Sequence, residues 1–215
     1  MNYRHAYHAG NHADVLKHIA LVRVIEHLKK KDKPFRLIDA HAGIGVYDLR
    51  GIEAEKTGEW QGGIGRMSEP FAADVEALLR DYRQCIAALN PGGGITFYPG
   101  SPDIAARLMR DGDRIVANEL HPEDVRKLQD HFRRDARVTV TGIDAELAVK
   151  ANLPPLERRG IILIDPPYEE KTETERALRM LAQGLRRFAS GVFMLWYPIK
   201  ADQIADHVCA QVSAL

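Results

Sequence analysis

The chain has 215 residues, of which 45% are hydrophobic, enough for one α/β domain with a sizeable core. Lys plus Arg and Asp plus Glu each number 30, so the net charge is zero and any contact with nucleic acid must come from a local patch. No apolar run approaches membrane-spanning length, and the N-terminus lacks the apolar core of a signal peptide. The two cysteines have no metal or redox spacing. These features predict a soluble, cytoplasmic protein.

Residues 1–12 contain three histidines, two tyrosines and one arginine. Aromatic rings can stack on bases and Arg can contact phosphate, so we favour a nucleic-acid contact over a solvated, disordered tail. The histidines His5, His8, His12 and His18 also suggest a metal site, but no Cys or paired carboxylate completes a ligand set. We therefore expect no metal.

A helix follows this segment, with Asn11 as its predicted N-cap and Asp14 in its first turn. Residues 35–40 then read as the first core strand, which carries Asp39 near its end and runs into a tight turn with Gly43 and Gly45. Glycines would let the backbone approach a ligand closely there, although a lone Gly-x-Gly is weak evidence.

Residues 47–95 interrupt the alternation of strands and helices with a polar loop, an amphipathic helix around residues 69–89 and the breaker at 90–94. We predict a small helical insertion above the carboxyl edge of the sheet, where it could contact a substrate. Residues 95–98 form a short strand-like segment. In the turn after it, Ser101 is the predicted N-cap of a helix whose first position is Pro102, and such a helix terminus can also attract a carboxylate.

Two further predicted strands end near acids. Residues 114–119 form the second core strand and end in Glu119, and residues 137–141 form the third, with Asp144 just beyond it. In dinucleotide-binding folds an acid at the end of the second strand binds ribose hydroxyls, usually about twenty residues after the glycine turn. The spacing between the glycine turn and Glu119 is much larger in this chain. The assignment of Glu119 therefore depends on the predicted insertion over residues 47–95. Taken alone, Asp144 is better explained as a helix N-cap.

Residues 160–168 predict the central strand and a candidate active site. Residues 161–164 are all apolar, as in a strand buried on both faces of a parallel sheet, and two prolines end the strand. Ligands bind at the carboxyl ends of such strands. Asp165 and the carbonyl of Pro166 could each accept an N–H from an exocyclic amine, and Tyr168 could stack on a base. An ordinary strand-to-turn junction is the alternative.

The rest of the chain completes an α/β pattern. A charged loop over residues 169–173 is expected to be a solvated face. A helix over 175–188, a fifth strand over 191–198 and a helix over 202–212 follow it.

The motifs resemble those of the RlmJ family, bacterial enzymes that methylate N6 of one adenine in 23S ribosomal RNA. The resemblance runs over essentially the whole chain and is most specific in the N-terminal signature. It is carried by residues 3–18, 39–43, 98–102, 118–122, 165–169 and 195–198.

This resemblance implies a Rossmann-like fold that binds S-adenosylmethionine (SAM). The residues implied to line the SAM site are His18, His41, Ser101, Glu119, Asp144, Ala145 and Asp165. Asp165, Pro166 and Tyr168 would be catalytic, and Tyr3, Arg4 and Tyr168 would contact the RNA. His41 stands where SAM-binding folds more usually have glycine, and Ala145 stands where we expect glycine in the family.

The resemblance also implies a final strand pair beyond residue 215. We expect that pair to be missing from this chain, which would leave the fifth strand as an exposed edge. We divide the chain into residues 1–46, the N-terminal RNA-contacting segment with its helix and the first SAM-binding strand; 47–95, the insertion; and 96–215, the remainder of the methyltransferase core.

The implied reaction is direct methyl transfer from SAM to adenine N6, because no Cys lies near the motifs to form a covalent intermediate. Asp165 would orient and polarise the amine. We expect a monomer whose partner is 23S ribosomal RNA. A DNA adenine-N6 methyltransferase could share every core motif, although zero net charge speaks against long-duplex binding. Protein glutamine methylation, which usually goes with Asn at the Asp165 position, and a non-catalytic RNA-binding module are further alternatives.

Overall fold

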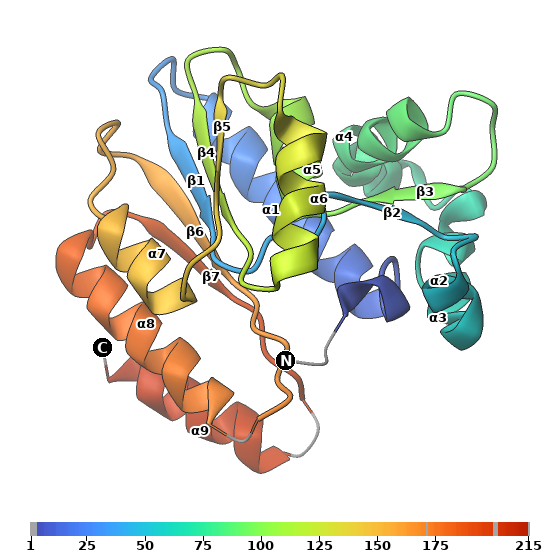
Figure 1. Ribbon diagram of the computed structural model, residues 1–215. Coiled ribbons are helices and arrows are strands. Elements are labelled where there is room, and N and C mark those ends of the chain that lie inside the picture. Colours follow the sequence, from blue (N-terminus) through green and yellow to red (C-terminus); the bar gives the residue numbers. More distant parts are fainter. Residues whose placement is uncertain (1–3, 171, 200–201, 215) are drawn as a thin grey trace.

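The computed structural model describes residues 4–170, 172–199 and 202–214. Its centre is a sheet of five parallel strands in the order β5-β4-β1-β6-β7 (Figure 1). The strands are β1 (Arg36–Asp39), β4 (Arg114–Asn118), β5 (Val138–Thr141), β6 (Gly160–Ile164) and β7 (Val192–Leu195). The chain runs outward from β1 to β5 on one side and then from β6 to β7 on the other. The switch point therefore lies between β1 and β6, where open α/β sheets bind ligands.

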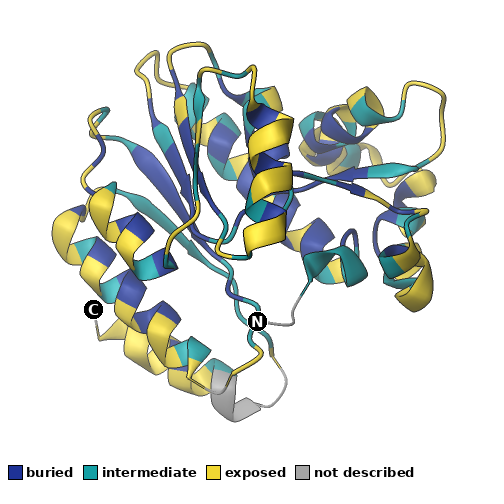
Figure 2. Ribbon diagram, in the orientation of Figure 1, coloured by how far each residue is buried: buried dark blue, intermediate teal, exposed yellow. Residues whose placement is uncertain are grey.

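Helices cover both faces of the sheet. On one face, α1 (His12–Lys29), α5 (Ser101–Leu108) and α6 (Pro122–Phe132) share a core with Leu37; on the other, α7 (Ala145–Ala151) and α8 (Glu173–Arg187) share a core with Ile38. Successive residues of a strand point to opposite faces, so every residue of β6 is buried (Figure 2). The all-apolar run of residues 161–164 is explained by this layering.

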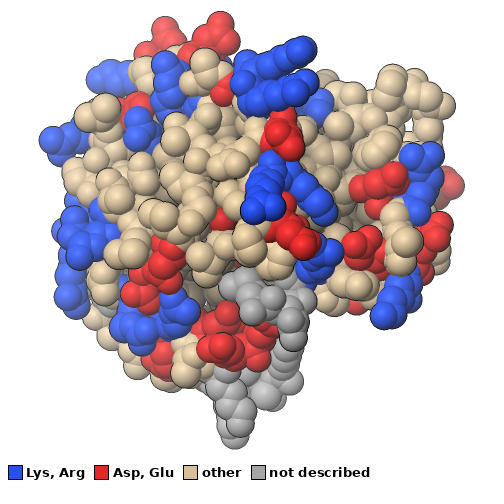
Figure 3. Space-filling view, viewed as in Figure 1, with Lys and Arg blue, Asp and Glu red and all other residues tan. Residues whose placement is uncertain are grey.

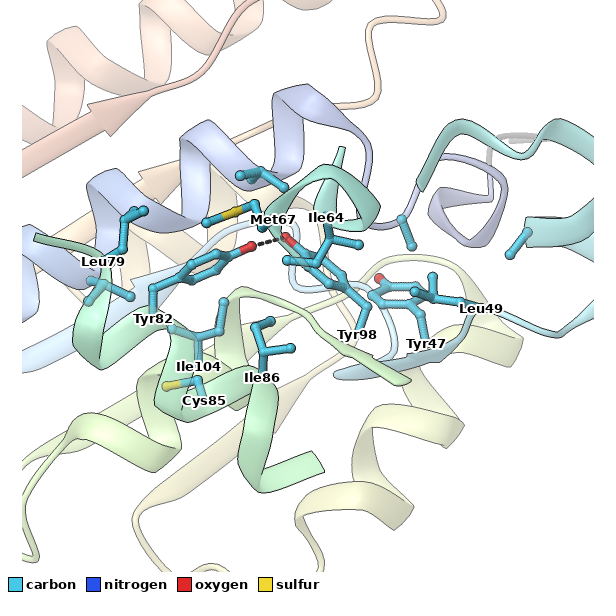
Figure 4. Packing of buried hydrophobic residues seen from close by; sticks show 14 residues of the cluster. Tyr47, Leu49, Ile64, Met67, Leu79, Tyr82, Cys85, Ile86, Tyr98 and Ile104 are labelled. Atoms are coloured by element: carbon cyan, nitrogen blue, oxygen red, sulfur yellow. Dashed lines mark hydrogen bonds between the residues drawn. The ribbon is translucent and has the colours of Figure 1, made fainter. Parts of the chain in front are cut away.

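The chain leaves the main sheet between β1 and β4 and forms a second unit, at the right of Figure 1. β2 (Val46–Asp48) and β3 (Phe97–Pro99) pair antiparallel. Between them lie α2 (Ile52–Thr57), α3 (Glu59–Gly62), the 3₁₀ helix η2 (Ile64–Ser68) and α4 (Ala73–Leu89). Tyr82 and Tyr98 lie in the core that this unit shares with α1 (Figure 4). The division of the chain at residues 47 and 95 remains a prediction, and β2 begins one residue before the first of these positions.

The N-terminal segment is folded against this unit. It begins with the 3₁₀ helix η1 (His5–Tyr7), and the Ile64 N–H donates to the Gly10 carbonyl over 2.8 Å. A Cβ at Gly63 would overlap the backbone of Gly10 and Asn11, so only glycine permits this close approach. The Asn11 side chain accepts from the Asp14 N–H, which confirms Asn11 as the N-cap of α1. Residues 5–14 are therefore ordered rather than a solvated tail.

Most predicted elements are present with ends shifted by a few residues, but one local prediction is wrong. Gly100, not Ser101, is the N-cap of α5. Ser101 is the first residue of that helix, and its hydroxyl donates to Asp39 Oδ2 over 2.6 Å instead of capping. Asp144 caps α7 as predicted, since it accepts from the N–H groups of Glu146 and Leu147.

β7 forms one edge of the described sheet, as expected, and β5 forms the other. The helix α9 (Asp202–Ser213) packs against α8. Within the part of the chain that the structure describes, no helix is long and apolar enough to cross a membrane.

Candidate active site

A cavity of about 120 Å³ opens beside the carboxyl ends of β1, β4 and β6. Residues far apart in the sequence line it, from α1, the turn after β1, the start of α5 and the facing helices α7 and α8. All seven residues that the resemblance assigns to the SAM site lie in this lining: His18, His41, Ser101, Glu119, Asp144, Ala145 and Asp165. Pro166 also lines the cavity. The fold thus brings the predicted site residues together at the switch point.

Asp165, directly after β6, is held by a cation that sequence reasoning did not identify. Lys17 on α1 forms an ion pair with Asp165 and lies 2.9 Å from Asp14 Oδ1. Lys17 is only 5% exposed. Burial alone would lower the pKa of the Lys17 ammonium, but the carboxylates of Asp14 and Asp165 outweigh it and raise that pKa above its ordinary value. A permanent buried cation therefore neutralises the carboxylate at the end of the central strand.

Asp14 connects this cation to the N-terminal segment. Asp14 Oδ2 accepts from the Gly10 N–H over 3.0 Å and lies 2.8 Å from His5 Nε2. Burial would raise the pKa of the Asp14 carboxyl, but His5 and Lys17 hold it well below its ordinary value. A continuous polar network therefore runs from His5 through Asp14 and Lys17 to Asp165. His5 lines the cavity too.

The turn after β1 is shaped by Gly43, whose φ of +63° lies in the left-handed region that favours glycine. The Gly43 N–H donates to Glu119 Oε2 over 2.9 Å, and the next N–H, of Ile44, donates to the Tyr47 hydroxyl over 3.3 Å. A Cβ at residue 43 would overlap that hydroxyl. Tyr47 is another lining residue that sequence reasoning missed.

Two acids, the half-buried Glu119 and the buried Asp39, hold the backbone around the cavity. Glu119 accepts from the Gly43 N–H and, through Oε1, from the His121 N–H over 2.8 Å; burial raises its pKa. Asp39 is fully buried and accepts from the Ser101 hydroxyl and, over 3.2 Å, from the His41 N–H. Burial raises the pKa of Asp39 to about 6, against the opposing hydrogen bond from Ser101. These acids fix the positions of His41, Ser101 and the glycine turn.

His41 and Asp144 complete the lining on the α7 and α8 side. The Asp165 N–H donates to His41 Nδ1 over 3.3 Å, and burial lowers the pKa of His41 to about 4, so the imidazole is a neutral acceptor at pH 7. Asp144 Oδ2 accepts from Arg176 on α8 over 2.7 Å. Arg176, also missed in the sequence, thereby links α8 to the start of α7 at the mouth of the cavity.

Neither of the described residues implied to contact RNA, Arg4 and Tyr168, is among the residues that line the cavity. Tyr3 lies outside the described residues. Arg4 forms an ion pair with Glu123 at the start of α6 and lies 3.8 Å from Glu53. Tyr168 has a φ of +55°, an uncommon conformation for a tyrosine, and its hydroxyl donates to the Trp196 carbonyl over 2.5 Å. The RNA-contacting roles of these three residues remain predictions.

The fold and the site together define a class. Acids at the ends of the parallel strands, a glycine turn after β1 and the Asp-Pro-Pro run after β6 converge on one cavity at the switch point. This is the arrangement of a Rossmann-like methyltransferase.

Comparisons with known proteins give the family. The family model described as "Ribosomal RNA large subunit methyltransferase D, RlmJ" matches residues 32–215. Ribosomal RNA large subunit methyltransferase J of Escherichia coli (strain K12) is 47% identical over 203 residues, which cover 94% of this chain and 72% of that protein. The protein of the same name from Haemophilus influenzae is 46% identical over 204 residues, with the same two coverages of 94% and 72%.

A solved structure agrees with these matches. The crystal structure of protein LPL1258 from Legionella pneumophila str. Philadelphia 1, of family DUF519, has a TM-score of 0.85 and 32% identity to this chain. The match covers 96% of this chain and 76% of the other. The chain belongs to the RlmJ family of large-subunit ribosomal RNA methyltransferases, which confirms the resemblance seen in the sequence motifs.

Proposed function

We propose that the protein transfers a methyl group from SAM to N6 of a specific adenine in 23S ribosomal RNA. Its family supplies the substrate class, since the relatives are named as methyltransferases of large-subunit ribosomal RNA. The observation that carries the chemistry is the carboxylate of Asp165, fixed by buried Lys17 at the first position of Asp-Pro-Pro-Tyr.

The charge of the cavity suits a cationic cofactor. Among the described lining residues, five acids face two permanent cations, Lys17 and Arg176; the acids are Glu119, Asp124, Asp144, Asp165 and Glu173. This excess of negative charge favours a sulfonium ligand. When bound, SAM supplies a methyl group that its positive sulfur already activates. His18, His41, Ser101, Glu119, Asp144 and Ala145 would hold it, as the resemblance implies.

Asp165 would receive the target amine. Lys17 occupies Oδ2, and no described residue hydrogen-bonds to Oδ1, which leaves that oxygen for one N–H of the adenine amine. The carbonyl of Pro166 would accept the second N–H, because the following Pro167 biases Pro166 towards an extended backbone. Because the sulfonium already activates the methyl group, no strong base is needed, and Asp165 would orient and polarise the amine while the proton leaves late.

Tyr168 would stack on the target base. Its hydroxyl is anchored on the Trp196 carbonyl after β7, and its backbone is held in the left-handed region. Both constraints limit the orientations of the ring. A ring that is ordered before the base arrives loses less conformational freedom on binding, which favours a stacked adenine beside Asp165.

A local basic patch offers a path for the RNA backbone. Figure 3 shows Lys and Arg side chains over α6, which begins beside the cavity. The exposed residues Arg126, Lys127, Arg133 and Arg134, here called the α6 patch, form no ion pair with a described residue. Unpaired cations can contact phosphates without first breaking an internal ion pair. The patch therefore supports an RNA substrate in spite of the zero net charge.

The test compares substrates. Purified protein is incubated with radiolabelled SAM and either protein-free 23S RNA or duplex DNA of matched adenine content, and the labelled nucleoside is identified. We expect N6-methyladenosine in the RNA at one position and background label in DNA. Preferential labelling of DNA would favour the DNA adenine methyltransferase alternative, and absence of SAM binding by calorimetry would favour the non-catalytic RNA-binding module.

A further inference from the structure

A buried hydrogen-bonded chain links the unit between β1 and β4 to the cavity. The Tyr82 hydroxyl on α4 lies 3.1 Å from the Tyr98 hydroxyl on β3 (Figure 4), and the Tyr98 hydroxyl lies 2.8 Å from His18 Nδ1 on α1. Tyr82 and Tyr98 are fully buried, and His18 is 1% exposed. His18 lines the cavity, so the Tyr82–Tyr98–His18 chain ends at the ligand site.

The number of hydroxyl protons determines which groups donate and which accept along the Tyr82–Tyr98–His18 chain. Each hydroxyl has one proton to donate, and no other described residue accepts from Tyr82. If Tyr82 donates to Tyr98 and Tyr98 donates to His18 Nδ1, both protons are used. If His18 Nδ1 carried a proton and donated to Tyr98, the Tyr82 or the Tyr98 proton would remain buried without an acceptor, which is costly. The first direction is therefore favoured.

His18 Nδ1 must then be the acceptor, and the ring proton of a neutral His18 must be on Nε2. Burial lowers the pKa of His18 to about 3, so the ring is neutral at pH 7. Within the described chain no residue hydrogen-bonds to Nε2, and this nitrogen is not among the fully buried atoms that lack a partner. Nε2 is thus the ring nitrogen that a ligand in the cavity can reach.

We propose that Tyr98 and Tyr82 are positioning residues that hold His18 in the Nε2–H tautomer, so that a neutral N–H donor faces SAM in the cavity. A neutral donor can bind an acceptor atom of SAM without repelling the sulfonium, as an imidazolium would. The proposal rests on the proposed function only in naming SAM as the ligand. It also gives the inserted unit a role, because an α4 side chain then acts on cofactor binding.

The tautomer can be measured in the ligand-free protein. The ¹⁵N resonances of the His18 imidazole are assigned by their loss in His18→Gln. We expect a pyridine-like signal at Nδ1 and a pyrrole-like signal at Nε2. The reverse assignment would overturn the proposal. This readout does not depend on SAM or RNA, so it can fail while the proposed function stands, or hold while that function fails.

Two matched substitutions test which nitrogen matters for SAM. The amide group of Gln in His18→Gln can place a donor near the position of Nε2, whereas the shorter Asn in His18→Asn places its donor near Nδ1. By calorimetry we expect SAM affinity to fall less than about threefold in His18→Gln and about tenfold in His18→Asn, the range of one hydrogen bond. Equal losses in the two variants, or the opposite order, would contradict the proposal. No binding by the unaltered protein would instead contradict the proposed function.

The tyrosines are tested by removing single hydroxyls. The rings of His18 and Tyr98 are stacked with centroids 5.6 Å apart, and Tyr98→Phe keeps this stacking while removing the donor to Nδ1. We expect SAM affinity to fall about three- to tenfold in Tyr98→Phe and less in Tyr82→Phe, where Tyr98 can still donate to His18. If SAM affinity fell as much in Tyr82→Phe as in Tyr98→Phe, the result would contradict the proposed order, in which Tyr82 donates to Tyr98 and Tyr98 donates to His18. Thermal melts of both variants identify any loss due to unfolding.

Discussion

Lys17 and Asp165 form an ion pair in the interior of the protein, which joins the N-terminal helix to the motif that ends the central strand. The pair is continued on the other side of Lys17 by Asp14. Buried ion pairs are weak evidence for net stability, but removal of one partner leaves an uncompensated charge. The geometry of Asp165 therefore depends on a residue that lies 148 positions away in the sequence.

Lys17→Met should lower both stability and methyl transfer. The buried carboxylate of Asp14 and the half-buried carboxylate of Asp165 would lose their cation, and we expect the free energy of unfolding to fall by about 3–5 kcal/mol. Methyl transfer should fall roughly hundredfold because Asp165 is misplaced. Urea unfolding and single-turnover assays measure the two effects. Lys29→Met is the control, since it removes a partly exposed ion pair with Glu26 on the same helix and should cost less than about 1 kcal/mol.

The double variant Lys17→Met with Asp14→Asn separates the two effects. Asp14→Asn removes one of the two carboxylate charges that Lys17→Met leaves without a cation. The free energy of unfolding should therefore recover relative to Lys17→Met. Methyl transfer should not recover, because Asp165 still lacks its partner. Recovery of both quantities would indicate that Lys17 matters only for folding.

Gly43→Ala should weaken SAM binding through a clash with one atom. The added Cβ would overlap the Tyr47 hydroxyl, whereas the next nearest atom, Tyr47 Cζ, is 3.3 Å away. Gly43→Ala combined with Tyr47→Phe should therefore bind SAM better than Gly43→Ala alone, with backbone strain of about 1–2 kcal/mol and the close 3.3 Å contact to the ring carbon remaining. Calorimetry measures the affinities. Gly93→Ala is the matched control, because Gly93 has a φ of +77° with no atom within 4 Å of the added Cβ.

His18 should make stability depend on pH. Burial lowers its pKa from 6.5 to about 3. Between these values the unfolded chain binds a proton that the folded protein does not, so this contribution is fully present above pH 6.5 and is lost as the pH falls towards 3. The slope is at most about 1.4 kcal/mol per pH unit. His18→Gln should flatten the pH dependence of the unfolding free energy between pH 6.5 and 4 by this amount, as measured by urea unfolding.

The pH experiment has two internal checks. Asp39, whose pKa is raised to about 6, opposes the slope over part of the range but is present in both proteins, so the difference isolates His18. Val22→Ala on the same helix lowers stability without removing a titrating group and should leave the slope unchanged. An unaltered slope in His18→Gln would mean that the folded protein does not keep this ring neutral.

The α6 patch should bind RNA through phosphates. Arg133→Ala with Arg134→Ala should weaken 23S RNA binding and lower the magnitude of the slope of log affinity against log salt by about 0.7–0.9 for each phosphate that the protein no longer neutralises. SAM affinity should be unchanged. The matched control is Arg186→Ala with Arg187→Ala, which removes the same charge from exposed residues at the end of α8. Equal losses in the two pairs would show that overall charge, not the α6 patch, determines RNA affinity.

Sequence patterns placed the strand ends correctly because the relevant signal is local. Asp165 and Glu119 each end an apolar run, and their places at the edge of the sheet follow from that run alone. The same reasoning missed Lys17. It lies on the buried side of α1 with Leu21, while the apolar residue next to it, Leu16, is 58% exposed. Hydrophobic periodicity depends on apolar residues alone. It therefore cannot identify a cation that is buried because it forms ion pairs.

Tertiary partners explain the remaining differences. Ser101 looks like an N-cap because capping depends only on neighbours, but its hydroxyl is used by Asp39, 62 residues away. His18 was assigned to the SAM site by resemblance, yet nothing near it in the sequence indicates the hydroxyl of Tyr98, 80 residues away. Roles that depend on such distant pairs become visible only in the folded chain.

We propose that Asp165 orients the adenine amine for direct methyl transfer. Single-turnover methylation of protein-free 23S RNA, with the N6-methyladenosine position mapped, is measured for the unaltered protein and for Asp165→Ala, together with SAM affinity by calorimetry. We predict that Asp165→Ala lowers methylation at the mapped adenine by about 10²–10³-fold or more while SAM affinity falls far less. Near-normal methylation of the same adenine by Asp165→Ala would contradict this role of Asp165.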